Sequence, residues 1–236
     1  MPVYKGSTKI GTSYRGGTKI ARIFKGDVKV FGDYKTIAKT VTTSGTVVVP
    51  ANVFRVDLLV IGGGGGGATS TFYRGNKWQG RAGASGAVCL SVFTGQASKN
   101  LRGKTLTYTV GAGGAAGGGA VSAGPNSTSG RNGGDGGTST ITGDEIAMSA
   151  TGGKGGMGGW YNNGHAAAAG TATGGNNLNK SGYAAPYNAN NVFAPTPSAW
   201  DDKTTGYGAG GWQEAYDGTI HAGVSGCAHW VFYVSE

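Results

Sequence analysis

The chain has 236 residues, of which 50 are glycine, and its formal net charge is +9. The glycines follow no Gly-X-Y period and there are only 6 prolines, which excludes collagen. Five tryptophans, eleven tyrosines and seven phenylalanines are too many large apolar side chains for a solvated, disordered coil. The composition therefore predicts a folded protein whose backbone packing requires glycine.

The positive charge is concentrated at the N-terminus. Residues 1–40 hold nine Lys and Arg against two Asp, a net charge of +7, and the remaining 196 residues hold only +2. Such a segment suits nucleic acid, an acidic membrane or an acidic protein partner. The first residues lack the apolar core of a signal peptide, and no stretch is long enough to span a bilayer. We therefore expect a protein made in the cytoplasm, without membrane insertion.

Residues 4–30 contain a repeat with a period of ten, in which an aromatic residue, a basic residue and a glycine recur in order. This pattern predicts short strands joined by tight turns. We interpret 1–35 as a β-repeat for attachment or oligomerisation, and the alternative is that its lysines form the solvated face of a small sheet. Nucleic acid is disfavoured, because aromatics at one fixed position per unit are more suited to packing than to stacking on bases. The candidate attachment residues are Tyr4, Lys5, Lys9, Tyr14, Arg15, Lys19, Phe24, Lys25 and Lys29.

Strand signals recur through 36–236, which we treat as one domain. Helical periodicity is nearly absent, and only 92–101 could form a single turn. The chain is therefore predicted to be all-β. The expected strands are 41–43, 46–49, 53–61, 86–93, 106–110, 138–142, 146–150 and 228–234.

Apolar strands run directly into glycine at several places. Val56–Ile61 is followed by six consecutive glycines, 62–67, and similar transitions occur near 111 and 152. Long glycine runs can form polyglycine II helices, extended left-handed threads without internal hydrogen bonds. Their peptide groups then need partners from neighbouring threads. A flexible linker is the alternative, but these runs are poor in serine and each is tied to a strand. We predict a β-sheet or sandwich scaffold whose strands run into a bundle of polyglycine II helices.

Polar, aromatic segments lie between the glycine runs, at 72–79, 160–165, 183–202 and 212–217, and are predicted to be loops where threads reverse. Their aromatic rings could stack on sugars while asparagines bond hydroxyl groups. The alternative is that the aromatics fold inward and cap the bundle. The candidate binding residues are Tyr73, Trp78, Trp160, Tyr161, Asn162, Asn163, Tyr187, Asn190, Asn191, Phe193, Trp200, Asp201, Trp212 and Tyr216.

The sequence does not predict an enzyme, a metal site or a cofactor. The three histidines have no metal-ligand spacing. Cys89 and Cys227 each lie in an apolar run, which predicts two buried thiols. Asp201-Asp202 lacks a defined partner carboxylate across a cleft, as a glycosidase would need. Matches to Gly-x-Gly-x-x-Gly arise from composition and open no helix.

Several motifs in order resemble the glycine-rich domain of bacteriophage tail-fibre proteins. They are SGTVVVP at 44–50, VDLLVIGGG at 56–64, LTYTVGAGG at 106–114, GGDGGTS at 133–139, ATGG at 150–153 and GVSGC at 223–227. The resemblance covers about 40–236 and extends to the tip adhesins of T-even-like phages. It implies a bundle of polyglycine II helices whose distal loops touch the host receptor.

The resemblance leads us to expect a virion protein: a tail-fibre adhesin that recognises a bacterial surface glycan or outer-membrane protein. It also implies a homotrimer. The basic N-terminal repeat, which lies outside the resemblance, is the segment that we expect to contact other phage tail or virion proteins. The alternative is a structural connector or decoration protein of the neck, tail or capsid. A polysaccharide depolymerase is disfavoured because the required pair of acids is missing.

Overall fold

A computed structural model gives the fold of the chain. It describes residues 3–5, 8–10, 13–15, 18–20, 22–25, 28–32, 34–78, 80–119, 121–124, 127–158, 167–185, 196–203, 205–214 and 219–235. Side chains are described from residue 34 onward, apart from those of 77 and 121–128. The described elements are β1 Val3–Lys5, β2 Thr8–Ile10, β3 Ser13–Arg15, β4 Thr18–Ile20, β5 Arg22–Lys25, β6 Val28–Gly32, β7 Tyr34–Val41, β8 Gly45–Val48, β9 Val53–Ile61, β10 Thr71–Tyr73, β11 Asn76–Trp78, β12 Val88–Thr94, α1 Gly95–Asn100, β13 Thr105–Thr109, β14 Val121–Gly124, β15 Ser127–Ser129, β16 Ser139–Gly143, β17 Ile146–Ala150, β18 Ala172–Thr173, β19 Leu178–Lys180 and β20 Cys227–Ser235.

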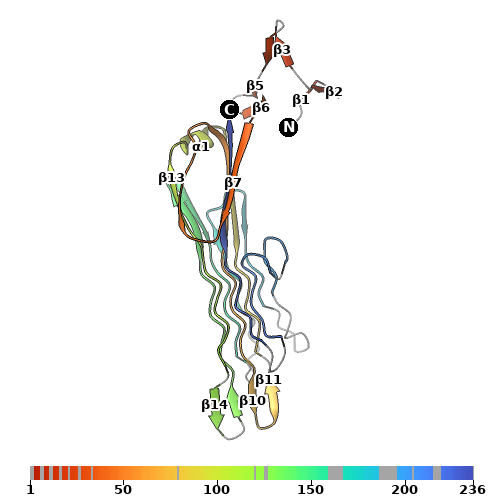
Figure 1. Cartoon of the computed structure of the whole chain (residues 1–236), viewed down its shortest axis with the longest axis vertical. Coiled ribbons are helices and arrows are strands. Elements are labelled where there is room, and N and C mark those ends of the chain that lie inside the picture. Colours follow the sequence, from red (N-terminus) through yellow and green to blue (C-terminus); the bar gives the residue numbers. More distant parts are fainter. Residues whose placement is uncertain are drawn as a thin grey trace.

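The molecule is elongated, with different structures at its two ends. Figure 1 shows β7, β13 and α1 at one end, which we call the sheet end, and β10, β11 and β14 at the other. Extended glycine-rich segments run lengthwise between them. The N-terminal strands and the end of β20 both lie at the sheet end. The far end, made of β10, β11, β14 and β15, is called the tip below.

The sheet end is built from two five-stranded antiparallel sheets. Their strand orders are β19-β12-β9-β20-β7 and β18-β17-β16-β13-β8. Val56, Leu58 and Val60 of β9 alternate toward the core, as expected for a half-buried strand, and are fully buried. They pack with Trp230 and Phe232 of β20 and with apolar residues of β13, β16 and β17 in a single cluster between the sheets. The expected all-β scaffold is confirmed.

The predicted strands of this scaffold lie close to those observed. The strand at 146–150 has the expected bounds, and the helical turn expected within 92–101 is α1. Sequence reasoning missed the beginning of β7, which starts at Tyr34 and pairs along its whole length with β20, from Tyr34↔Ser235 to Val41↔Ala228. A pairing between the two ends of the sequence is a tertiary feature and leaves no local signal.

The basic repeat forms three hairpins. Each unit of ten residues contributes one antiparallel pair, β1–β2, β3–β4 and β5–β6. The aromatic position of each unit pairs with a lysine: Tyr4 with Lys9, Tyr14 with Lys19, and Phe24 with Lys29. The short strands predicted from the repeat are therefore present, and all nine candidate attachment residues lie on them.

Both cysteines are free and buried, as predicted. Burial raises the pKa of the Cys227 thiol to about 12 and also raises that of Cys89. Both thiols are accordingly held in the protonated, unreactive form.

Seven extended segments of the described chain run lengthwise between these sheets and the tip. They are segment I at 62–70, II at 80–87, III at 111–119, IV at 130–138, V at 151–158, VI at 208–213 and VII at 219–226. Segment I lies at the centre, and the other six surround it in the order III, IV, V, II, VI, VII. Backbone hydrogen bonds join each pair of neighbours in this ring: Gly134 N to Ala115 O, Gly133 N to Gly156 O, Ala84 N to Lys154 O, Gly83 N to Gly211 O, Val224 N to Ala209 O, and Gly223 N to Gly114 O.

The hydrogen bonds of segment I repeat every three residues. Its N–H groups donate in turn to segments II, IV and VII, which run antiparallel to it, and its carbonyls accept from III, V and VI, which run parallel. All six neighbours are thereby used, which satisfies the peptide groups of a fully buried chain. The donated bonds are Gly62 N to Ala87 O, Gly63 N to Gly137 O, Gly64 N to Val224 O, Gly65 N to Ala84 O, Gly66 N to Gly134 O, Gly67 N to His221 O, Ala68 N to Arg81 O and Thr69 N to Arg131 O.

This packing explains the run of six glycines. A Cβ atom added at Gly64 would lie 1.9 Å from the Ala209 carbonyl oxygen, and at Gly66 it would lie 1.9 Å from that of Ala115. Every side of segment I faces another backbone. Segments IV and V have an outer side that is less enclosed, and each repeats two glycines followed by a larger residue, as with exposed Asp135 in segment IV and exposed Lys154 in segment V.

Candidate functional site

The tip is a four-stranded sheet made from two hairpins far apart in sequence. Its order is β11-β10-β15-β14. The first hairpin connects segment I to segment II, and the second connects III to IV. They pair through Phe72 with Thr128 and Tyr73 with Ser127. The glycine bundle therefore brings both hairpins together at the end farthest from the N-terminal strands (Figure 1).

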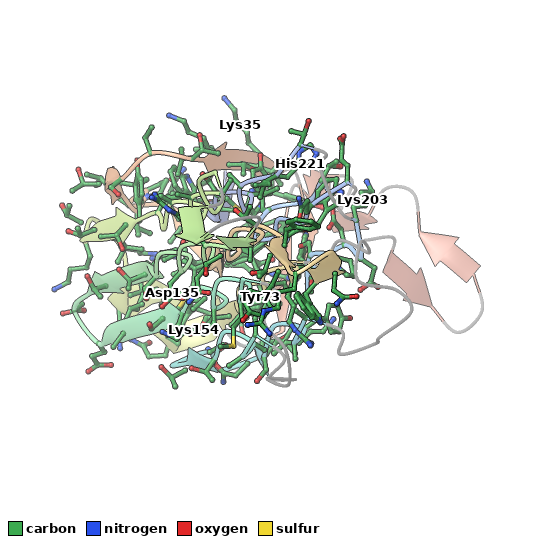
Figure 2. The ribbon with its side chains drawn as sticks, turned by 90° about the horizontal axis from the view of Figure 1, so that it is seen from below. Lys35, Tyr73, Asp135, Lys154, Lys203 and His221 are labelled. Atoms are coloured by element: carbon green, nitrogen blue, oxygen red, sulfur yellow. The ribbon has the colours of Figure 1, made fainter. Side chains whose placement is uncertain are left out.

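Aromatic and cationic groups gather on the first hairpin. Tyr73 pairs with Asn76 and Thr71 with Trp78, which places Tyr73 and Trp78 on the same face. Their ring centroids are 6.4 Å apart, and the guanidinium carbon of Arg74 lies 5.1 Å from the Tyr73 centroid. Tyr73 is 41% exposed and Trp78 is half-buried. Figure 2, which views the molecule from below, shows Tyr73 among the side chains at this end.

The turn of this hairpin has an unusual residue. Arg74 has φ 48° and Gly75 φ 82°, so both central residues lie in the left-handed region that a two-residue hairpin of the I′ type requires. Glycine adopts this region freely, whereas arginine does so at a cost. Sequence reasoning treated 72–79 as a loop, and the glycine flanked by Arg74 and Asn76 was the signal for a hairpin.

Trp200 and Asp201 lie away from the tip, and the chain reversal expected within 183–202 falls partly on 186–195, which lie outside the described residues. The turn at 199–201 is at the sheet end, where Ala199 packs with Ile61 and Cys227. Trp200 is 47% exposed. The reason is chain direction: segment 196–198 returns toward the sheets beside segment VI, with Gly210 N donating to Thr196 O at 2.9 Å.

Trp212 packs along the side of the bundle. Its ring stacks on His221 at 4.2 Å between centroids and contacts a cluster of buried alanines that includes Ala82 and Ala84. His221 Nε2 lies 2.8 Å from Glu214 Oε1. This position corresponds to the alternative interpretation, in which an aromatic covers the glycine backbones.

The other candidate binding residues lie outside the described residues. They are Trp160, Tyr161, Asn162, Asn163, Tyr187, Asn190, Asn191, Phe193 and Tyr216. Of the described candidates, only Tyr73 and Trp78 come together.

A side groove, missed by sequence reasoning, lies between segments IV and V and residues 168–171. It encloses about 360 Å³ and is lined by threonines with Asp135 and Lys154. Lys154 Nζ bonds Asp135 Oδ2 at 2.6 Å, and Gly155 N donates to Oδ1 at 2.9 Å. These bonds, that from Lys154 first, lower the pKa of the Asp135 carboxyl. Figure 2 labels both residues on one side of the bundle. The patterns Gly-Gly-Asp and Gly-Gly-Lys in the sequence were the available signal for this groove. Because Asp135 and Lys154 neutralise each other, the groove carries little net charge.

Within the described part of the chain, no three His, Cys, Asp or Glu side chains gather as metal ligands would. Among the same residues, no helix has the length and apolar character needed to cross a bilayer.

The fold and the tip define an elongated all-β protein whose two sheets continue into a bundle of glycine-rich segments ending in an aromatic hairpin. The chain belongs to the glycine-rich domain family, whose sequence pattern matches residues 39–231. No curated protein matches the chain.

Proposed function

We propose that the protein is a bacteriophage tail-fibre adhesin, a component of the virion that binds a bacterial surface glycan or outer-membrane protein. One observation carries this proposal: an aromatic hairpin with half-exposed Tyr73 stands at the end opposite the N-terminal strands. Such a shape suits a protein that attaches at one end and binds at the other. The N-terminal hairpins then contact other tail proteins, and the resemblance to tail fibres supports a homotrimer.

We further propose that segments I–VII are polyglycine II helices. Support comes from the three-residue period of the hydrogen bonds donated by segment I, because a helix of this class has three residues per turn. The six hydrogen-bonded neighbours of segment I would make the shaft stiff. A crystal structure with backbone dihedrals near φ −75° and ψ +145° along 62–67 supports this assignment, whereas flat β-strand values contradict it.

Adsorption of the labelled full-length chain to a panel of bacterial cells tests the adhesin. The Tyr73→Ala variant should lose adsorption to the strain that the unmodified chain binds, whereas Trp200→Ala, which removes an exposed aromatic at the sheet end, should retain it. Loss with Trp200→Ala and retention with Tyr73→Ala would overturn the assignment of the tip. Failure of the unmodified chain to bind any strain of an infected host would overturn the adhesin itself.

A connector or decoration protein of the neck, tail or capsid is the second candidate. It is favoured by the half-exposed Trp200 at the sheet end, a large apolar side chain that a neighbouring virion protein would cover. Cryo-electron microscopy of the particle separates the two functions, because a connector has its tip buried against neighbours and an adhesin has it in solvent.

A further inference from the structure

We propose that the tip recognises an anionic glycan, with the sugar face on Tyr73 and Trp78 and the acidic group on Arg74. The inference rests on the proposed adhesin function and adds the chemical class of the receptor. Three independent features of the tip support it: its charge, the geometry of its aromatic and cationic groups, and the backbone conformation of Arg74.

The two hairpins of the tip and the adjoining ends of segments I–IV are basic. Residues 69–81 and 117–132, which form the two hairpins and the adjoining ends of segments I–IV, include four Lys and Arg and no Asp or Glu. Arg131 is exposed, and Arg81 is half-buried at the same level. Glu214, a described acidic residue that directly follows segment VI, is bonded to His221. A cluster of one sign at the end of a rod concentrates oppositely charged ligands there.

The arrangement of Tyr73, Trp78 and Arg74 suits a sugar that bears a carboxylate or phosphate. Two adjacent rings on one face form an apolar platform for the C–H face of a pyranose ring. Arg74 stacks over Tyr73, and stacking occupies the face of a guanidinium while its N–H edge remains able to bond a planar anion through two parallel hydrogen bonds. A neutral sugar would use only the platform.

Arg74 also occupies a position that its own backbone disfavours. The first central residue of this turn has φ 48°, where asparagine or glycine is preferred. An unfavourable residue at an exposed turn points to a role for its side chain rather than for folding. The same conformation makes Arg74→Asn an informative variant, because asparagine should relieve the backbone strain of the turn while the cation is removed.

The test measures binding of the full-length chain to immobilised bacterial polysaccharides in three groups: uronate-bearing, phosphate-bearing and neutral. Binding should be confined to one or both acidic groups, which also shows whether the anion is a carboxylate or a phosphate. Raising the salt from about 0.05 M to about 0.5 M should weaken binding about tenfold or more. Arg74→Asn should lower affinity by a similar factor while its Tm stays equal or rises. Lys203→Asn, which removes an exposed cation at the sheet end, should bind normally.

Equal binding to neutral polysaccharides, or binding to none of the three groups, would overturn the inference. So would full affinity in Arg74→Asn, or an equal loss in Lys203→Asn. These outcomes differ from failure of the adhesin function. If cells adsorb Arg74→Asn normally at high salt, only the proposal of an anionic receptor is overturned. If the unmodified chain adsorbs to no host strain, the adhesin function itself is overturned.

Discussion

At the scale of single residues, the packing of the chain depends on the absence of a Cβ atom in glycine. Glycine normally costs conformational entropy on folding. In segment I this cost is offset because the absence of Cβ lets six backbones approach close enough to hydrogen-bond. The same residue type at the periphery has no such role, since a Cβ added at Gly119 would meet no atom within 4 Å. The contribution of a glycine to stability therefore depends on its position in the bundle.

Replacement of a central glycine should therefore destabilise the protein strongly. Gly64→Ala places a methyl group 1.9 Å from a carbonyl oxygen, so segment VI must move. We expect a loss of about 3 kcal/mol or more in the free energy of unfolding, measured by denaturant titration. Gly119→Ala, the matched control, should change it by no more than about 0.5 kcal/mol. Equal effects of the two substitutions would contradict the central position of segment I.

His229 should make stability depend on pH. It lies on β20, and its Nδ1 is 2.7 Å from the Thr40 hydroxyl of β7. Burial lowers the pKa of His229, with partial opposition from Asp57. As the pH falls below about 6.5, the imidazole of His229 binds a proton more readily in the unfolded chain than in the folded one. The free energy of unfolding therefore decreases as the pH is lowered through that value. Tm should be lower at a pH of about 5 than at about 7.5, and His229→Gln should reduce this difference. If the difference in Tm between the two pH values is as large in His229→Gln as in the unmodified chain, other titratable groups cause it.

At the scale of elements, the joints between strands and glycine segments need side chains as well as backbone. Ser139, at the start of β16, is fully buried. Its hydroxyl donates to Ile61 O at 2.7 Å and accepts from Gly111 N at 2.9 Å. It thus links the points where β9 and β13 become segments I and III. A small side chain with both a donor and an acceptor is what this joint requires.

Ser139→Ala should weaken the joint by removing the buried hydrogen bonds that its hydroxyl makes with Ile61 O and Gly111 N. A buried group that loses its partner costs about 1–3 kcal/mol, so we expect a loss of about that size in the free energy of unfolding. Thr109→Ala is the control, because it also removes a hydroxyl bond, to Thr140 at 2.8 Å, but on an exposed face. It should cost about 0.5 kcal/mol or less. Chemical denaturation measures the free energy of unfolding of both variants. Similar losses in the two would argue against a special role for the joint.

At the scale of the whole molecule, the two sheets and the glycine bundle form one hydrogen-bonded unit. Segment I continues β9, which lies at the middle of the first sheet, so a central strand leads into the central segment of the bundle. The strands hold the ends of the glycine-rich segments in register, and these segments in turn position the tip.

Hydrogen exchange should reveal this single unit. The amides of Gly62–Ala68 are all bonded inside a ring of neighbours, so they should exchange only through global unfolding, at rates like those of β9. Exposed Gly118 and Gly119 should exchange orders of magnitude faster. Rapid exchange throughout 62–68 would show that the threads open separately from the sheets. Residue-resolved exchange by NMR or mass spectrometry gives the answer.

Local sequence patterns accounted for much of the fold. Alternating apolar residues located the strands of the scaffold, and the period of ten located the N-terminal hairpins. The glycine runs marked the extended segments. The tip was predicted only in part: Tyr73 and Trp78 were chosen for their residue types, but their hairpin was interpreted as a loop, and Arg74, which lies over the Tyr73 ring, was not among the candidate residues.

The sequence by itself determined that this chain is all-β, where most strands of its scaffold lie, and that glycine packing would follow them. These properties depend on neighbours in the chain. Tertiary structure alone decided which segment is central, that β7 pairs with the C-terminal strand, and that Trp200 lies far from Tyr73. The physical reason is that the peptide groups of an extended glycine-rich segment bond to neighbouring segments. The partners of each segment, and with them the direction and position of each turn, are therefore set only when all segments pack together.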